Sequence, residues 1–253
     1  MSQSGEINET QAFLEALDRL PPNALTACAG WTVHEITAHI AAGADEIARL
    51  FEAYGEGQPV PETRGWEERE APYRAMDDAA LRKHLFSASV RMGSAMQAVF
   101  AREPDAVIPF TGMPMTAATF AMHSRSECAI HRWDMVGDDD VSWKLLSQPE
   151  IANHAVTVLA PLLFQRGCGS SSAPSGGFTA RIRAAGQPDI VAQRDASGAV
   201  LTFEPDDGSP AIETDAAARL LFIWGRRPGD PSRIRSGVPE GDRLRLQSLL
   251  AGA

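Results

Sequence analysis

The sequence predicts an α+β protein in which an N-terminal bundle of helices precedes a small C-terminal domain of strands and helices. Two observations lead to this fold class. Apolar residues recur with the helical period through most of residues 6–165, and proline or glycine separates the segments. After a glycine- and serine-rich segment, the period shortens toward two. We therefore expect a helical domain over residues 1–166, a flexible linker over 167–177 and an α+β domain over 178–253.

Five helices account for the N-terminal domain. Proline ends the first one at Pro21, and the capping-box patterns Thr32–Glu35 and Ser147–Glu150 open the second and the fifth. Glycine- and proline-rich stretches, the longest over 55–76, predict loops, and a loop of that length is often functional. The expected helices are 6–20, 33–54, 78–102, 117–136 and 149–165.

The C-terminal domain begins with segments that alternate in hydrophobicity and are separated by Gly186, Pro188 and Gly198. Apolar runs with helical spacing follow them. We expect strands over 178–184, 190–194 and 199–204, and helices over 213–224 and 241–250.

Composition excludes several classes of protein. The formal charge is −10 and no basic run interleaves with aromatic residues, so nucleic acid is not an expected partner. No apolar stretch is long enough to span a membrane, and the acidic N-terminus does not resemble a secretory signal. Cys28, Cys128 and Cys168 form no CxxC pair or disulfide framework, which favours a cytoplasmic location. We expect a monomer or a homodimer.

Three side chains could bind a divalent metal. Glu127 and His131 are four residues apart on an expected helix and so share one face. His39, on an earlier helix, could supply a third ligand. Two histidines and one carboxylate leave coordination positions open, as in a catalytic metal site. The same pair could instead be an exposed helix face or a buried ion pair, and Glu35 could simply orient His39.

Arginines could bind an anionic substrate or cofactor. The segment Trp224-Gly225-Arg226 follows an apolar helix, so Arg226 could either cap that helix or hold a carboxylate. Arg91 and Arg82 are weaker candidates for the same role. Cys128 lies about 100° around the helix from Glu127, so we interpret it as a core residue and expect any reactive thiol to come from outside the protein.

Three segments of the chain resemble the signature segments of the mycothiol-dependent maleylpyruvate isomerase family, which belongs to the DinB-like superfamily of metal-binding four-helix bundles. They are Gly30–Ile40, Arg125–Asp134 and Leu220–Arg226, and the resemblance extends over nearly the whole chain. It implies that His39, Glu127 and His131 bind a divalent metal, most often zinc. It also implies that Arg226 contacts substrate or cofactor, and that the cofactor is mycothiol or a similar low-molecular-weight thiol.

The resemblance predicts an enzyme in which a metal-activated thiolate attacks a small electrophile. The reaction is then either cis–trans isomerisation of a maleylpyruvate-type acid or transfer of the thiol to the substrate, and the sequence leaves both open. Two other functions also remain open. One is a non-catalytic module that holds a lipid or another small molecule in its C-terminal domain, and the other is a metal-dependent hydrolase.

Overall fold

The computed structural model describes residues 8–170 and 176–252. Its internal contacts divide the chain into two units, one of residues 13–127 and one of residues 1–12 together with 128–253. The boundary at 127/128 falls inside one continuous helix, α5 (Ala117–Val136). Helix α5 therefore contributes residues to both units, which are described separately below.

The unit of residues 13–127 is mainly helical. It begins within α1 (Glu9–Arg19), close to the expected first helix, whose residues 6 and 7 lie outside the described part. The expected second, third and fourth helices are confirmed with bounds that differ by two residues at most. In chain order the unit also holds α2 (Val33–Gly55), α3 (Trp66–Arg74), α4 (Asp78–Arg102), β1 (Ile108–Phe110), β2 (Met113–Met115) and the first part of α5.

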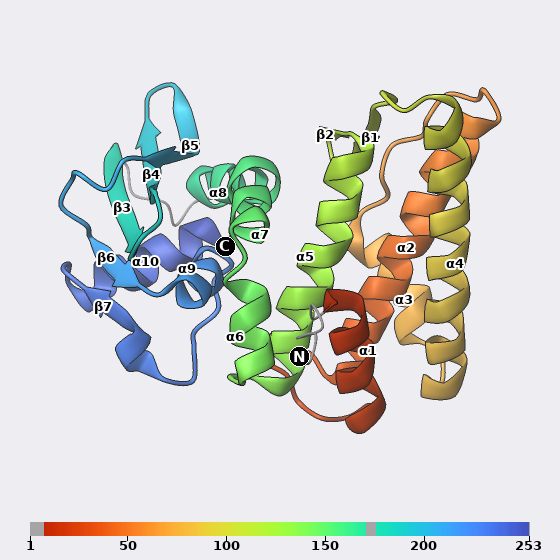
Figure 1. The fold of residues 1–253 in the computed structure, drawn as a ribbon, viewed down its shortest axis with the longest axis horizontal. Helices are drawn as coiled ribbons and strands as arrows, with labels where there is room; N and C mark the ends of the chain where they lie inside the picture. Colours follow the sequence, from red (N-terminus) through yellow and green to blue (C-terminus); the bar gives the residue numbers. More distant parts are fainter. Residues whose placement is uncertain (1–7, 171–175, 253) are drawn as a thin grey trace, which may run out of the picture. The chain divides into compact units, whose positions relative to one another are not determined.

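Helices α2 and α4 run parallel to each other, while α5 runs antiparallel to both (Figure 1). Contacts follow this arrangement, because Asp45 pairs with Arg91 and, nine residues further along α2, Tyr54 pairs with Glu103. Phe51 of α2 packs edge-on against Phe120 of α5, with ring centroids 5.0 Å apart. Apolar residues from all three helices and from β1 and β2 form one core around this aromatic pair.

Two segments that we expected to be loops contain regular structure. Within 55–76, Gly65 is the N-cap of α3 and Pro72 is tolerated near its end, so both residues belong to a helix. Helix α3 packs on α2 and buries Arg69, Glu70 and Tyr73. Around Pro109, β1 and β2 form a hairpin whose turn residues Thr111 and Gly112 both have positive φ, the backbone twist that a two-residue hairpin requires.

The second unit combines short helices with a five-stranded sheet. The three expected strands are confirmed. The helix expected over 213–224 is shorter in the structure than predicted, because its first residues form a strand. The helix expected over 241–250 is confirmed. The elements are α6 (Asp140–Leu146), α7 (Pro149–His154), the π-helical η1 (Ala155–Leu159), α8 (Ala160–Gly169), β3 (Phe178–Ala184), β4 (Asp189–Asp195), β5 (Gly198–Glu204), β6 (Ile212–Thr214), α9 (Ala216–Ile223), η2 (Pro231–Arg233), β7 (Ile234–Ser236) and α10 (Glu240–Leu250).

The sheet has the order β5-β4-β3-β6-β7, with only the β3–β6 pair parallel. Helix α8 packs on β5 and on α10, and α9 packs on β3 and β6.

Helix α6, capped by Asp139, was not expected, because Asp138–Asp140 resembles a helix stop in the sequence. The fold class expected from the sequence, a helical N-terminal region followed by a sheet-containing C-terminal region, is confirmed. Among the described helices, none combines the length and hydropathy needed to cross a bilayer.

The expected linker over 167–177 begins inside a helix, and its residues 171–175 lie outside the described part. Gly167 is in α8, where a Cβ atom would lie 2.2 Å from the backbone oxygen of Leu249 in α10. Glycine is thus required at this position because two backbones approach closely, not because the chain must be flexible.

We expect Gly167→Ala to lower the free energy of unfolding by about 2 kcal/mol or more, since the backbones of α8 and α10 must separate. Gly169→Ala is the matched control, because a Cβ there meets nothing within 4 Å, and it should be neutral or stabilising. Urea unfolding of the two variants and the parent measures the difference. Equal stability of the two variants would contradict this packing.

Candidate functional site

The antiparallel pairing of α2 and α5 brings together two of the expected metal ligands. His39 lies on the first half of α2 and Glu127 lies in the middle of α5, and His39 Nε2 is 3.2 Å from Glu127 Oε2. Both side chains are largely buried, with 15% and 18% of their surfaces exposed. Trp31, which precedes α2, lies beside the His39 ring at a centroid distance of 5.4 Å.

Helix α3 holds the other nitrogen of His39. Glu70 Oε1 lies 2.8 Å from His39 Nδ1, and Arg74 Nη1 donates to the second oxygen of Glu70 at 3.0 Å. A carboxylate only accepts hydrogen bonds, so Nδ1 carries a proton and Nε2 is directed toward Glu127. Burial acts to raise the pKa of Glu70, but the hydrogen bond with His39 and the charges of His39, Arg69 and Arg74 hold the pKa below its ordinary value.

His131 has a similar partner within the second unit. Its Nδ1 lies 2.9 Å from Asp134 Oδ2, one turn further along α5. Arg226 donates from Nε and Nη2 to the two oxygens of Asp134, at 2.9 and 2.8 Å. Asp134 is fully buried, which acts to raise its pKa, but the hydrogen bonds from His131 and Arg226 hold the pKa well below the usual range.

The chain reversal after α9 places Arg226. Gly225 has φ +74°, and the N–H groups of Gly225 and Arg226 bond to carbonyls near the end of α9. A third donor of Arg226, Nη1, bonds to the Trp224 carbonyl at 3.0 Å. Arg226 thus partly caps its own helix, one of the two readings of the sequence, while it also grips Asp134.

Helix α5 carries both Glu127, which contacts His39, and His131, which contacts Asp134. Because the helix is continuous from Ala117 to Val136, Glu127 and His131 are one turn apart on the same face, as expected from their spacing. Their relation follows from the geometry of a single helix. Within the first unit His39 lies beside Glu127, and His131 follows Glu127 by one turn on the same helix.

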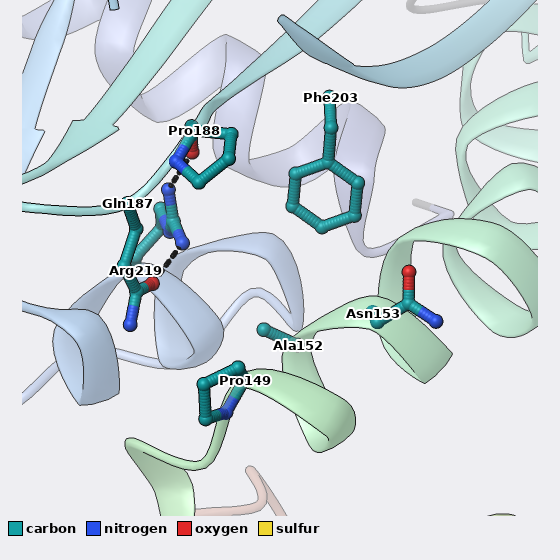
Figure 2. A pocket seen from close by; sticks show the side chains of 7 residues that line it. All are labelled: Pro149, Ala152, Asn153, Gln187, Pro188, Phe203 and Arg219. Atoms are coloured by element: carbon teal, nitrogen blue, oxygen red, sulfur yellow. Dashed lines mark hydrogen bonds between the residues drawn. The ribbon is translucent and has the colours of Figure 1, made fainter. Parts of the chain in front are cut away.

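A shallow pocket in the second unit is lined by residues of α7, α9 and strand β5 (Figure 2). Its volume is about 210 Å³ and most of its lining is apolar. Arg219 reaches it from α9, but Pro188 and Gln187 already accept hydrogen bonds from its guanidinium. Pockets that bind small molecules usually measure about 300–1,000 Å³, so this pocket gives little support to a lipid-binding module.

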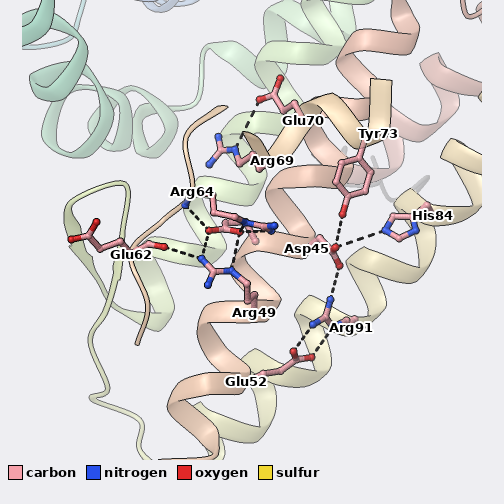
Figure 3. Close-up of polar contacts among 11 residues, drawn as sticks. Asp45, Arg49, Glu52, Glu62, Arg64, Arg69, Glu70, Tyr73, His84 and Arg91 are labelled. Atoms are coloured by element: carbon pink, nitrogen blue, oxygen red, sulfur yellow. Dashed lines mark hydrogen bonds and ion pairs between the residues drawn. The ribbon is translucent and has the colours of Figure 1, made fainter. Parts of the chain in front are cut away.

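The structure does not bring Arg91 to His39 and Glu127. Arg91 is bound by Asp45 and Glu52 on the face shared by α2 and α4, as Figure 3 shows. Glu52 lies 13 residues beyond His39 on α2, or about 20 Å at 1.5 Å per residue. A contact between Arg91 and a cofactor stays a prediction, and it would require these ion pairs to break. Arg82 donates to the Leu17 carbonyl at 2.8 Å and ties α1 to α4.

Two of the cysteines, Cys128 and Cys168, occupy places that fit a structural role. Both side chains are buried, whereas Cys28 is partly exposed. Cys128 Sγ lies 3.8 Å from the Thr10 hydroxyl, and burial raises the pKa of Cys168.

Sequence reasoning missed Glu70 and Asp134. Glu70 was hidden because its helix was read as a loop, although Arg69, Glu70 and Tyr73 have the spacing of one buried helical face. Asp134 is the last residue of the segment Arg125–Asp134, and its i, i+3 relation to His131 could have identified it as a partner of that histidine.

Residues 4–136 match the family model described as "Mycothiol maleylpyruvate isomerase N-terminal domain". Two crystal structures of a mycothiol-dependent maleylpyruvate isomerase, one of them of a mutant, are similar in fold. Each has a TM-score of 0.62 and 16% sequence identity, over 92% of this chain and 91% of the other. At this identity the likeness shows the fold alone. A search of curated proteins finds no significant match.

We expect Asp134→Asn to lower the free energy of unfolding by about 3–5 kcal/mol at pH 7, because Arg226 loses its buried counter-charge. The depressed pKa of Asp134 stabilises the fold above the unfolded-state pKa of about 4, so the difference should shrink as the pH falls below that value. Urea unfolding at pH 7 and at low pH measures it. The exposed Asp140→Asn is the control and should change stability by less than about 1 kcal/mol. A difference that did not depend on pH would contradict the assigned charge.

Proposed function

Because the chain belongs to the mycothiol maleylpyruvate isomerase family, as its match over residues 4–136 shows, we propose that it is a metal-dependent enzyme that uses a low-molecular-weight thiol. The thiol acts as nucleophile on a small electrophilic substrate. In this proposal His39, Glu127 and His131 bind the metal, for which zinc is the best candidate, and mycothiol or a similar molecule supplies the thiol.

One observation carries the proposal. Each histidine has its Nδ1 held by a buried carboxylate, His39 by Glu70 and His131 by Asp134. Histidines that bind metal in proteins usually have this arrangement, because the carboxylate fixes the ring and leaves Nε2 to coordinate the ion. Glu127 and His131 are therefore not simply part of an exposed helix face, because His131 and the neighbour of Glu127, His39, are both oriented by buried carboxylates.

The distance between His39 and Glu127 also fits a shared ion. Two ligands bound to one zinc at tetrahedral angles are about 3.3 Å apart, and His39 Nε2 lies 3.2 Å from Glu127 Oε2. With Nδ1 protonated toward Glu70, Nε2 faces a carboxylate that can only accept. This contact is favourable only when Nε2 carries a second proton or when a cation lies between the two atoms. The donor set therefore fits a divalent metal with open coordination positions.

When bound, such a metal would lower the pKa of a thiol at an open position and so supply a thiolate at neutral pH. The protein's own residues do the remaining work. Glu70 and Asp134 fix the tautomers and the ring orientations of the two histidines. Arg226 keeps Asp134 ionised and in place, which makes it a positioning residue for His131. A direct contact between Arg226 and the substrate or the thiol stays a prediction.

The two possible reactions differ in the fate of the thiol. Isomerisation would use the thiol as a nucleophile that is returned unchanged together with the trans product. Transfer would leave the thiol on the substrate in place of a leaving group. Membership of the mycothiol maleylpyruvate isomerase family favours isomerisation for this chain.

We expect the alanine variants of His39, Glu127 and His131 each to lose bound zinc, because two remaining ligands hold the ion far more weakly than three. His84→Ala is the control: His84 lies on α4 beside Tyr73 and Asp45 and has no proposed role. Zinc per chain, measured after dialysis by atomic emission, reports the outcome. Full zinc content in all three variants would exclude the proposed ligand set.

Incubation of the zinc-loaded protein with mycothiol and a maleylpyruvate-type acid tests the reaction itself. Isomerisation should yield a product of unchanged mass whose double bond is trans by NMR, and the rate should depend on both thiol and zinc. A stable thiol conjugate detected by mass spectrometry would show transfer instead. Turnover that persists without any thiol would reject both reactions and favour metal-dependent hydrolysis.

A further inference from the structure

Arg69, on α3, is a buried cation, and two of its nitrogens lack hydrogen-bond partners among the described residues. The residue is 4% exposed, and neither Nε nor Nη1 has a hydrogen-bond partner in the described part of the chain. Its ion pair is long, with Nε 4.0 Å from Glu70 Oε1. The guanidinium also lies over the ring of Phe110, 6.0 Å from the centroid. Figure 3 shows it beside Glu70.

The neighbouring arginines are bonded quite differently. Arg49 and Arg64, labelled in Figure 3, donate to the buried carboxylate of Glu46. Arg74 donates to Glu70. The oxygens of Glu70 are thus occupied by His39 and Arg74. Arg69 is surrounded by acidic groups that already bind other donors, so the described residues offer its Nε and Nη1 no acceptor.

Such an arrangement is costly unless something else supplies the acceptor. A buried donor without a partner costs about 1–3 kcal/mol, and more when it is charged. Exceptions of this kind in native structures call for an explanation, such as a functional role or a bound water or ion. Either a carboxylate or a neutral carbonyl could accept from the N–H groups, and a carboxylate would form the stronger, charge-assisted hydrogen bonds.

The position of Arg69 links it to the candidate metal ligands. It precedes Glu70, which holds His39, and the charge of Glu127 acts on its guanidinium. His39 and Glu127 keep 15% and 18% of their surfaces exposed, so this side of the unit is not fully closed to solvent. All these residues lie within residues 13–127.

We propose that Arg69 binds a carboxylate of the substrate next to the metal ligands, and so selects acidic substrates. This inference rests on the proposed function for the identity of the ligand as substrate. The binding of an anion by Arg69 does not require that function, and the two can be tested separately.

The test is the affinity of the full-length protein for succinate, measured by calorimetry with and without zinc, in the parent and in Arg69→Met. Loss of charge-assisted hydrogen bonds should weaken binding about 10- to 100-fold in the zinc-free protein. Arg102→Met, which removes an exposed cation bonded only to the Gly55 carbonyl among the described residues, is the matched control and should bind succinate as the parent does. Uncharged succinamide should not bind.

A second measurement does not depend on the uncharged Arg69→Met variant. In the parent, the Nε–H resonance of Arg69, assigned by its absence in Arg69→Lys, should shift as succinate is added. Lysine lacks the guanidinium fork, so Arg69→Lys should bind succinate more weakly although the charge is kept.

Several outcomes would overturn the inference: no succinate binding by the parent, equal affinity in Arg69→Met, an unmoved Arg69 resonance, or equal binding of succinamide. Zinc content distinguishes failure of anion binding by Arg69 from failure of the proposed metal-dependent function. Arg69→Met should retain the parent's zinc. If the parent binds succinate through Arg69 but binds no zinc, the metal-dependent function fails and the anion site stands.

Discussion

The arrangement of the candidate site depends on hydrogen bonds between buried carboxylates and histidine Nδ1 atoms. Imidazole can rotate and can carry its proton on either nitrogen, so a histidine on a helix does not by itself present a defined ligand atom. Glu70 and Asp134 remove that freedom, and each is itself held by an arginine, Arg74 and Arg226 respectively. The helices bring the histidines into place, and the carboxylates determine which nitrogen is available.

These contacts also explain why carboxylates can be buried here at all. Removing Asp134 or Glu70 from water favours their neutral forms, yet in both cases the surrounding donors keep the pKa below its ordinary value. A neutral acid could donate its proton to the imidazole and would no longer fix the tautomer. The arginine behind each carboxylate thus maintains the protonation state on which the histidine in front of it depends.

The sequence predicted most of the helices of the first unit and three strands of the second, because helical periodicity and capping residues are local signals. The ligand set His39, Glu127 and His131 came from one i, i+4 pair and from a resemblance. The partners of those residues were harder to predict. Glu70 is 31 residues from His39, in a segment whose glycine and proline mimic a loop, and Asp134 meets Arg226 across 92 residues. No local pattern encodes such pairs, since only the packing of α3 on α2, and of the chain after α9 against α5, brings them together.

The parallel course of α2 and α4 has a consequence for how this family could diversify. Two consecutive parallel helices need a chain segment that returns along their full length, and here that return contains α3. The proposed ligands His39 and Glu127 lie on long helices whose other faces fill the core, so those helices tolerate little change. Helix α3 has nine residues and sits outside that core. Under the assignment of Arg69, new acid specificities could therefore evolve by replacing residues in one short return segment, while the metal ligands and the bundle stay unaltered.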